Sequence, residues 1–415
     1  MGKRSECKGR LLALLVLLLC AGLRVGHGYG GDLAGLAPLA RSILGADQGV
    51  YIESADGTML LAQAADVAVH PASVSKVPTS LALLRKLGAE YRFVTTFSAS
   101  GPVRDDTITG DLLVEGGGDP YFVDENALLV AQRLNEAGMH RVDGSVRTRG
   151  TFLFDWQVDG ASELLQQALS GKVSVSAWVS LQSLSPELHS LPALQFGAAS
   201  GISPLAPDSR AVQPLLVHRS QPLLSLIKSL NDYSNNVFKP LADAAGGATV
   251  VQSLARASVP ESMHSEITLG DGAGTDPRNR LSPRAAVYLL RALERELALS
   301  GHTLVDALPV AGIDAGTLHD RFNGPQETGR IVGKTGTFGD YGASALIGAI
   351  PTSARGTVYF AILNHGVRVA EARNRQDRFL RALLGRLASV PWNYQPDLRP
   401  AVARAQVDLL GTDPH

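Results

Sequence analysis

Cysteine is almost absent from this chain of 415 residues. Its two cysteines, Cys7 and Cys20, lie in an N-terminal stretch where basic residues precede an apolar run and small residues follow. This pattern is typical of a secretory signal peptide, so we expect residues 1–28 to be removed and the protein to be exported. A retained membrane anchor is the alternative, although the run is short for a span. The mature chain then has no disulfide, thiol nucleophile or thiolate metal site.

Lysine is also scarce. Beyond residue 28 the chain has only six lysines among many more arginines: Lys76, Lys86, Lys172, Lys228, Lys239 and Lys334. Arginine therefore carries most of the positive charge, whereas a lysine amine can lose its proton when it is desolvated or placed near another cation. The mature chain is mildly acidic, which excludes an electrostatic footprint for nucleic acid. The histidines lack the spacing of zinc ligands, and we expect no metal or other cofactor.

Apolar patterning predicts an α/β (α+β) fold, an antiparallel sheet flanked by helices. In the parts that flank an interruption we expect strands at 50–53, 59–62, 331–337, 344–350 and 357–364, and helices from about residue 71 to Gly88 and at 223–230, 283–299 and 370–387. Short alternating strands and one clear helix at 125–137 occupy the interruption, with a glycine run at 116–118 as a turn and residues 190–222 as loop. We therefore expect a discontinuous catalytic domain (29–90 and 223–390), an inserted, mostly β domain (91–222) and a tail (391–415).

Three short strings carry the candidate chemistry. Ser73-Val74-Ser75-Lys76 begins a helical pattern, Ser234-Asn235-Asn236 lies where another helix breaks, and Lys334-Thr335-Gly336 belongs to a strand. Each string alone is a weak signal, but in this order they form a three-part serine acyl-transfer site. A serine acyl transferase needs a hydroxyl that is deprotonated as it attacks, donors for the oxyanion and a proton for the leaving amine.

Each residue of the strings suits one of these tasks. Ser73 supplies the hydroxyl, and Lys76, on the same helix face, acts as base if Lys334 lowers its pKa. Ser234 relays a proton to the leaving nitrogen, and Asn236 binds the substrate amide. The substrate-binding candidates are Lys334 and Thr335 for a carboxylate, Gly336 for an extended peptide along the strand, and the N–H groups of Ser73 and Thr337 for the oxyanion.

With these motifs the chain resembles the low-molecular-mass class C penicillin-binding proteins, the D-alanyl-D-alanine carboxypeptidase/endopeptidases of bacterial cell walls. The resemblance runs from about residue 45 to 388 and includes Gly110–Val114, Gly117–Pro120, Asp271–Gly274, Asn279–Pro283, Leu308–Gly312 and Leu363–Gly366. It implies a penicillin-recognising serine transferase fold, an acyl-enzyme mechanism on peptidoglycan stem peptides that end in D-Ala-D-Ala, and β-lactams as covalent inhibitors.

The chain departs from the family in places. Ala273 stands where the family has the serine of Asp-Gly-Ser-Gly, and the insert is shorter than is usual in the family. Arg278 is a candidate for the family arginine that seats a diaminopimelate-type side chain of the peptide. A serine β-lactamase shares all three motifs but needs a water-activating glutamate, and Glu294-Arg295-Glu296 lies inside a helical pattern instead. An esterase of similar fold and a catalytically silent peptidoglycan-binding protein are further alternatives. A silent homologue should have lost Ser73, Lys76 or Lys334, and this chain keeps all of them.

Overall fold

The computed structural model describes residues 33, 35–197, 213–232, 238–340 and 342–410. The expected signal peptide and all of Ser234-Asn235-Asn236 lie outside the described residues. Within that part of the chain, no helix is long and apolar enough to cross a membrane.

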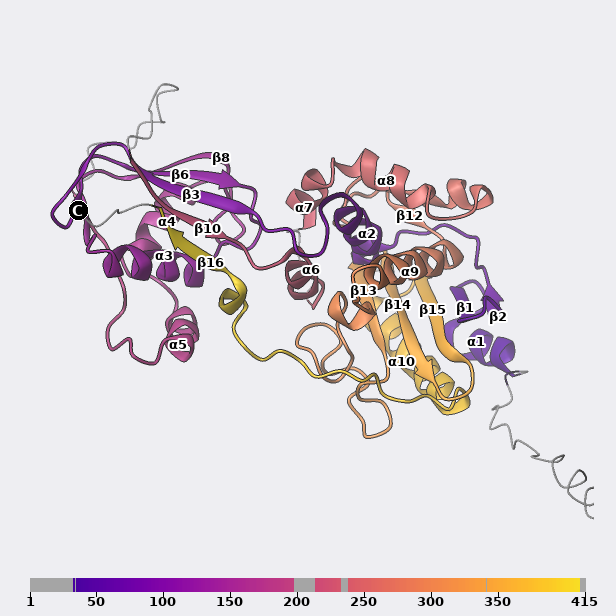
Figure 1. Cartoon of the computed structure of the whole chain (residues 1–415). Helices are drawn as coiled ribbons and strands as arrows, with labels where there is room; N and C mark the ends of the chain where they lie inside the picture. The colour runs from indigo at the N-terminus through magenta and orange to yellow at the C-terminus, as the bar shows by residue number, and fades with distance from the viewer. Residues whose placement is uncertain (1–32, 34, 198–212, 233–237, 341, 411–415) are drawn as a thin grey trace, which may run out of the picture.

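The catalytic part is built on an antiparallel sheet with the strand order β13-β14-β15-β1-β2 (Figure 1). Its strands are β1 (Gly49–Ser54), β2 (Met59–Gln63), β13 (Val332–Phe338), β14 (Ala343–Thr352) and β15 (Gly356–His365). The expected strands are therefore present, each within a few residues of its predicted bounds. Strand β13, which carries Lys334-Thr335-Gly336, forms the edge, since among the described residues it pairs with β14 and otherwise makes only a single bridge from Val332 to Val310.

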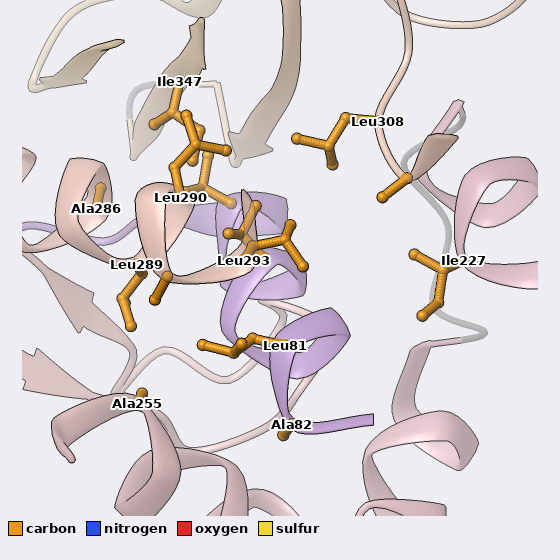
Figure 2. Packing of buried hydrophobic residues seen from close by; sticks show 14 of the residues in the cluster. Leu81, Ala82, Ile227, Ala255, Ala286, Leu289, Leu290, Leu293, Leu308 and Ile347 are labelled. Carbon is orange, nitrogen blue, oxygen red and sulfur yellow. The ribbon is translucent and has the colours of Figure 1, made fainter. Parts of the chain in front are cut away.

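Helices cover both faces of this sheet. On one face, α1 (Leu36–Leu44) and α10 (Val369–Arg386) pack on alternate strand residues such as Ile52, Leu346 and Phe360. On the other face, α2 (Lys76–Leu87) and α9 (Pro283–Ala298) pack on the intervening residues, including Ile347. Figure 2 shows this second core, where Leu290 and Leu293 of α9 lie among side chains of α2 and β14. Because both faces are buried, the central strands read as nearly continuous apolar runs.

Smaller elements complete this part of the molecule. Helix α2 also packs against α6 (Leu223–Asp232), α7 (Phe238–Ala244) and α8 (Ala248–Arg256). Short 3-10 turns lie at η1 (Ala72–Ser75), η2 (Glu261–Glu266) and η3 (Leu304–Asp306), and β11 (Ile267–Thr268) pairs with β12 (Arg280–Leu281).

Residues of the expected insert form a second sheet beside the first (Figure 1). Its order is β16-β10-β3-β6-β8, with β3 (Val94–Ala99), β6 (Leu112–Gly117), β8 (Val146–Thr151), β10 (Gln213–Arg219) and β16 (Gln406–Leu409). A smaller sheet joins β4 (Val103–Arg104), β5 (Thr107–Ile108), β7 (Arg141–Val142) and β9 (Gln195–Phe196). Helices α3 (Asp124–Glu136), α4 (Ala161–Leu169) and α5 (Val175–Leu184) also belong to this region, so it is more helical than the mostly β insert we expected.

Two other expectations for this region are wrong. The glycine run does not form a turn: Gly116 and Gly117 lie in β6, and a Cβ on Gly117 would stand only 2.3 Å from the carbonyl oxygen of Val94. These glycines are therefore needed for close approach of backbones rather than for a change of direction. Residues 213–219, expected as loop, form the strand β10.

The C-terminal segment is more than the tail we expected. Beyond α10 it crosses from the catalytic part to the second sheet, where β16 pairs with β10 in the register Leu216↔Leu409 (Figure 1). On the catalytic side, the Tyr394 hydroxyl donates to Asp314 Oδ1 at 2.7 Å. A Pro-rich sequence hides this pairing, because a short edge strand is defined by its distant partner rather than by its own pattern.

We expect truncation after Arg404, which removes β16, to lower the midpoint of thermal unfolding by a few degrees. The strand is mostly exposed, so the loss amounts to a few exposed backbone hydrogen bonds, about 1–2 kcal/mol in total. Truncation after Leu410 is the matched control and should leave the midpoint unchanged. Circular dichroism of both proteins checks this, and equal midpoints would contradict the stabilising role of β16.

Candidate active site

The serine of the first motif lies in the 3-10 turn η1, directly before α2, as the sequence predicted for a helix start. Ser73 is 8% exposed, and the residue before it, Ala72, has φ +50°, which a residue with a side chain rarely adopts. The Ala72 N–H donates to His70 Nδ1 at 3.1 Å, so His70 Nε2 carries the proton and donates to the Asp276 carbonyl at 3.0 Å. His70 also stacks on Phe338 of β13, with ring centroids 3.9 Å apart. Sequence reasoning missed His70, which holds the strained backbone beside Ser73.

Two glycines bring other segments against this turn. A Cβ on Gly336 would lie 2.6 Å from the Pro71 carbonyl oxygen and 3.1 Å from the Ser73 nitrogen. A Cβ on Gly274 would lie 2.0 Å from the Ala72 carbonyl oxygen, and Gly274 has φ +91°. Glycine at these positions lets β13 and the 271–274 loop reach the backbone of Ser73. Gly336 thus makes room for η1, and its expected place along a bound peptide stays a prediction.

Lys76 is fully buried at the start of α2. Burial, together with the charge of Lys334, lowers the pKa of its amine to about 6, against a smaller opposing effect of Asp271. The Nζ atom also lies 5.0 Å from the ring centroid of Phe238 at the start of α7. A pKa near 6 leaves most of the amine neutral at pH 7, which is the state that a general base requires.

Lys334 is the second fully buried lysine of the site. Burial lowers its pKa to about 8, while the carboxylate of Asp232 acts in the opposite direction. Its Nζ donates to the carbonyl oxygen of Thr335 at 3.1 Å. Lys334 is therefore largely cationic at neutral pH, and that charge contributes to keeping Lys76 neutral.

In the sequence, the segment that contains Ser234 and Asn236 lies between the end of α6 and the start of α7. Asp232, the last residue of α6, interacts electrostatically with Lys334, and burial raises its pKa to about 7. Phe238, the first residue of α7, contacts the Lys76 amine. Described residues on both sides of the second motif thus act on the two lysines, Asp232 electrostatically and Phe238 through its ring, and the roles of Ser234 and Asn236 stay predictions.

The remaining sequence candidates have definite partners. The Thr335 hydroxyl lies 2.7 Å from the Thr317 hydroxyl, and the Thr337 hydroxyl accepts a hydrogen bond from Arg373 at 2.8 Å. Neither Thr317 nor Arg373 was a sequence candidate. Arg278, in contrast, pairs with Asp276 two residues away, and its side chain is 75% exposed. Its expected role in seating a peptide side chain stays a prediction.

The loop that carries Ala273 is organised around Asp271. Burial favours its neutral form, but hydrogen bonds from Thr275, Asn279 and the Gly274 N–H outweigh this and lower its pKa. Ala273 is buried in the core beneath, where the serine of the related family would need a polar partner. The alanine removes a hydroxyl without disturbing the contact of this loop with η1.

The glutamates that resembled a β-lactamase loop have structural partners. Both lie on α9, where Glu294 accepts a hydrogen bond from the Tyr359 hydroxyl and Glu296 pairs with Arg85 of α2 at 3.0 Å. Their carboxylates link α9 to the sheet and to α2. The two glutamates therefore lie on the surface of a helix, as the sequence predicted.

A cleft of about 370 Å³ lies behind the site rather than over Ser73. It is lined by α6 and the C-terminal segment, including Lys228, Asp232 and Tyr394. Among the described residues, no three His, Cys, Asp or Glu side chains gather where they could hold a metal ion.

Comparison with known proteins agrees with this geometry. A sequence model of the D-Ala-D-Ala carboxypeptidase 3 (S13) family matches residues 36–161 and 199–384. The chain belongs to this family. Carboxypeptidase DacB of Mycolicibacterium smegmatis is 27% identical over 370 residues, covering 79% of this chain and 78% of that protein. The predicted resemblance to class C penicillin-binding proteins is confirmed, and so is the predicted enzyme class, a serine-type D-Ala-D-Ala carboxypeptidase.

Solved structures confirm the predicted fold. A penicillin G-acylated predatory endopeptidase from Bdellovibrio bacteriovorus has a TM-score of 0.75 at 20% identity, covering 87% of this chain and 99% of its own. Penicillin-binding protein 4 from Haemophilus influenzae, in complex with a β-lactam, has a TM-score of 0.59 at 16% identity, covering 86% of this chain and 100% of its own. This S13 family member therefore has the fold of penicillin-recognising enzymes.

The two lysines predict a bell-shaped dependence of the acylation rate on pH. The rate should rise with pH through about 6, where Lys76 loses its proton and becomes a base, and fall through about 8, where Lys334 loses its charge. Stopped-flow acylation between pH 5 and 9 measures the profile. Lys86→Met, which removes an exposed lysine of α2, is the control and should leave the profile unchanged. A rate that rises steadily to pH 9 would contradict a cationic Lys334.

Proposed function

We propose that Ser73 is the nucleophile of this S13 family member and that Lys76 is its base. The observation that carries the proposal is the contact of η1 with β13, which brings Lys334 close enough to depress the pKa of Lys76 beside Ser73. Ser73 Oγ attacks the carbonyl carbon of the penultimate D-Ala, and its proton passes to the Lys76 amine. The C–N bond to the last residue then breaks, and that residue leaves as an amine after taking up a proton. Water hydrolyses the resulting ester and regenerates the hydroxyl.

We assign the second motif to proton transfer and substrate orientation. Ser234 relays the proton from Lys76 to the leaving nitrogen, and Asn236 binds the substrate amide. The N–H groups of Ser73 and Thr337 stabilise the oxyanion. Asp232 and Phe238 flank this motif; the first interacts electrostatically with Lys334 and the second lies against the Lys76 amine, which supports the assignment of the motif to the same site.

We assign substrate binding to the edge strand β13. An extended stem peptide can add to the unpaired side of an edge strand through main-chain hydrogen bonds. Thr335, Gly336 and Thr337 are the residues along which the peptide would lie, with Lys334 as a positive charge near its terminal carboxylate. Arg278, at the rim, is assigned to the side chain of the stem peptide.

The substrate and setting follow from the family and the leader. The proposed substrates are peptidoglycan stem peptides ending in D-Ala-D-Ala, and β-lactams acylate the same serine because they present a reactive amide beside a carboxylate. Residues 1–28 are proposed to direct export to the periplasm or cell envelope, where peptidoglycan is found. Efficient β-lactam hydrolysis is disfavoured, since Glu294 and Glu296 are engaged by Tyr359 and Arg85.

Covalent labelling tests the nucleophile. Incubation with a fluorescent penicillin should give an adduct that mass spectrometry places on Ser73, and Ser73→Ala should lower turnover on the order of a million-fold. Ser75→Ala is the matched control in the same turn. Its hydroxyl is buried and makes no hydrogen bond among the described residues, so its loss should leave labelling intact. An adduct on another residue, or none, would refute the assignment.

Replacing the two lysines by arginine separates base from charge. Lys76→Arg keeps the charge but cannot supply a neutral amine, so acylation should fall by about a hundred-fold or more. Lys334→Arg keeps the charge that the substrate needs, and measurable acylation by penicillin should survive. Equal losses in both variants would argue that Lys76 acts only as a charge.

A further inference from the structure

The two faces of β13 have different partners. Lys334, Gly336 and Phe338 alternate with Thr335 and Thr337 along the strand, so the two sets of side chains point to opposite faces. Gly336 and Phe338 contact Pro71 and His70, which places the first set on the side of the nucleophile. The two threonines face the other side, roughly 7 Å apart along the strand. This face of the strand therefore carries two hydroxyl groups in a row beside the strand edge, with Thr335 buried at 5% exposure and Thr337 exposed.

Arg373 of α10 reaches this face of the strand. Its Nη2 donates to Thr337 Oγ1 at 2.8 Å, and the side chain is exposed to solvent. Among the described residues, no carboxylate lies within ion-pair distance of Arg373; Asp377, the acidic group that acts on it, is held by Arg321. Because a guanidinium has five N–H donors, most of its capacity is open to a ligand. Burial and Arg321 lower the pKa of Arg373, yet an arginine stays charged at neutral pH.

Thr317 holds the other hydroxyl of the pair. Its Oγ1 lies 2.7 Å from Thr335 Oγ1, and its backbone N–H donates to the Asp232 carbonyl at 3.0 Å. A Cβ on the preceding Gly316 would lie 1.9 Å from that same carbonyl, so the loop is closely packed on the end of α6. When Thr317 donates to Thr335, the proton of the Thr335 hydroxyl is left to point at a ligand. One residue thus connects the end of α6 with the third motif and orients its hydroxyl.

We propose that Arg373 is a specificity-determining residue that binds the terminal carboxylate of the substrate together with the hydroxyls of Thr335 and Thr337, and that Thr317 positions Thr335. The inference rests on the proposed function of the Ser73 site. Lys334 is fully buried, and its Nζ donates to a backbone carbonyl, so it serves the nucleophile side of the strand. Arg373 supplies a permanent, forked cation on the side where the carboxylate would leave the strand edge.

A pair of acyl donors that differ only in the carboxylate tests this inference. We would measure second-order acylation constants for benzylpenicillin and for its methyl ester. Arg373→Gln should lower the constant for the acid by about ten- to a hundred-fold and change that for the ester by less than about two-fold, since charged hydrogen bonds are lost only with the acid. For the acid, the constant of Arg373→Lys should lie between those of the wild type and Arg373→Gln. Lysine keeps the positive charge but loses the paired N–H donors of the guanidinium. Arg378→Gln removes an exposed charge from the same helix and should change neither constant.

Thr317 has its own variants. Thr317→Val should lower the constant for benzylpenicillin several-fold, and Thr317→Ser, which restores the hydroxyl, should recover it. Thr328→Val is the control, since the Thr328 hydroxyl donates only to the Gly324 carbonyl in the same loop. The ester reports on the fold of each variant, because its acylation needs Ser73 but not the carboxylate site.

The outcomes distinguish this inference from the proposed function. Equal losses for acid and ester in Arg373→Gln, or no loss for the acid, would overturn the role of Arg373. If Thr317→Ser does not recover the acylation constant for benzylpenicillin, the positioning role of Thr317 would be overturned. A wild-type protein that neither donor acylates would overturn the proposed function itself, and this inference with it.

Discussion

The site depends on two ammonium groups that share one dry interior. Burial of either amine disfavours its charged form, and the cation at Lys334 disfavours a second cation at Lys76. Lys76 therefore loses its proton near neutral pH, and its neutral amine can then act as a base. The contact that imposes this state is the approach of η1 to β13, and Gly336 permits it because any Cβ there would meet Pro71 and Ser73. Backbone geometry thus sets the protonation state.

The rest of the fold fixes the positions of η1 and β13 relative to each other. A sheet covered on both faces gives β13 a rigid register with β14, while its other side stays open to a peptide. The strained Ala72 is fixed from outside by His70, which is itself stacked on Phe338 of the same strand. Strain of this kind persists only where its surroundings over-determine it. The proposed nucleophile is therefore positioned by the strand to which we assign substrate binding.

Most of the catalytic fold could be predicted because its signals are local. Alternation and helical spacing place β13, β14, β15 and α9 within a few residues, and the motif order gives the chemistry. The errors concern distant partners: β10 pairs with β3 and β16, and β16 pairs with β10, so each strand is defined by residues far away in the sequence. The sequence analysis missed three further residues for the same reason: His70, Thr317 and Arg373. Each acquires its role from a hydrogen bond to a residue far away in sequence, which the residue type alone does not indicate.

The free-energy cost of burying two lysines argues against the alternative that this protein is a catalytically silent homologue. Two lysines without solvent exposure lose the hydration of their ammonium groups, and only part of that loss is recovered from Asp232, Asp271 and the ring of Phe238. Methionine at either position would fill a similar volume without that penalty, as apolar replacements of buried ions often do. A protein that only bound peptidoglycan would be more stable without the pair. Proton transfer at Ser73 and the binding of an anionic substrate together give a physical reason for retaining both amines, one neutral and one charged.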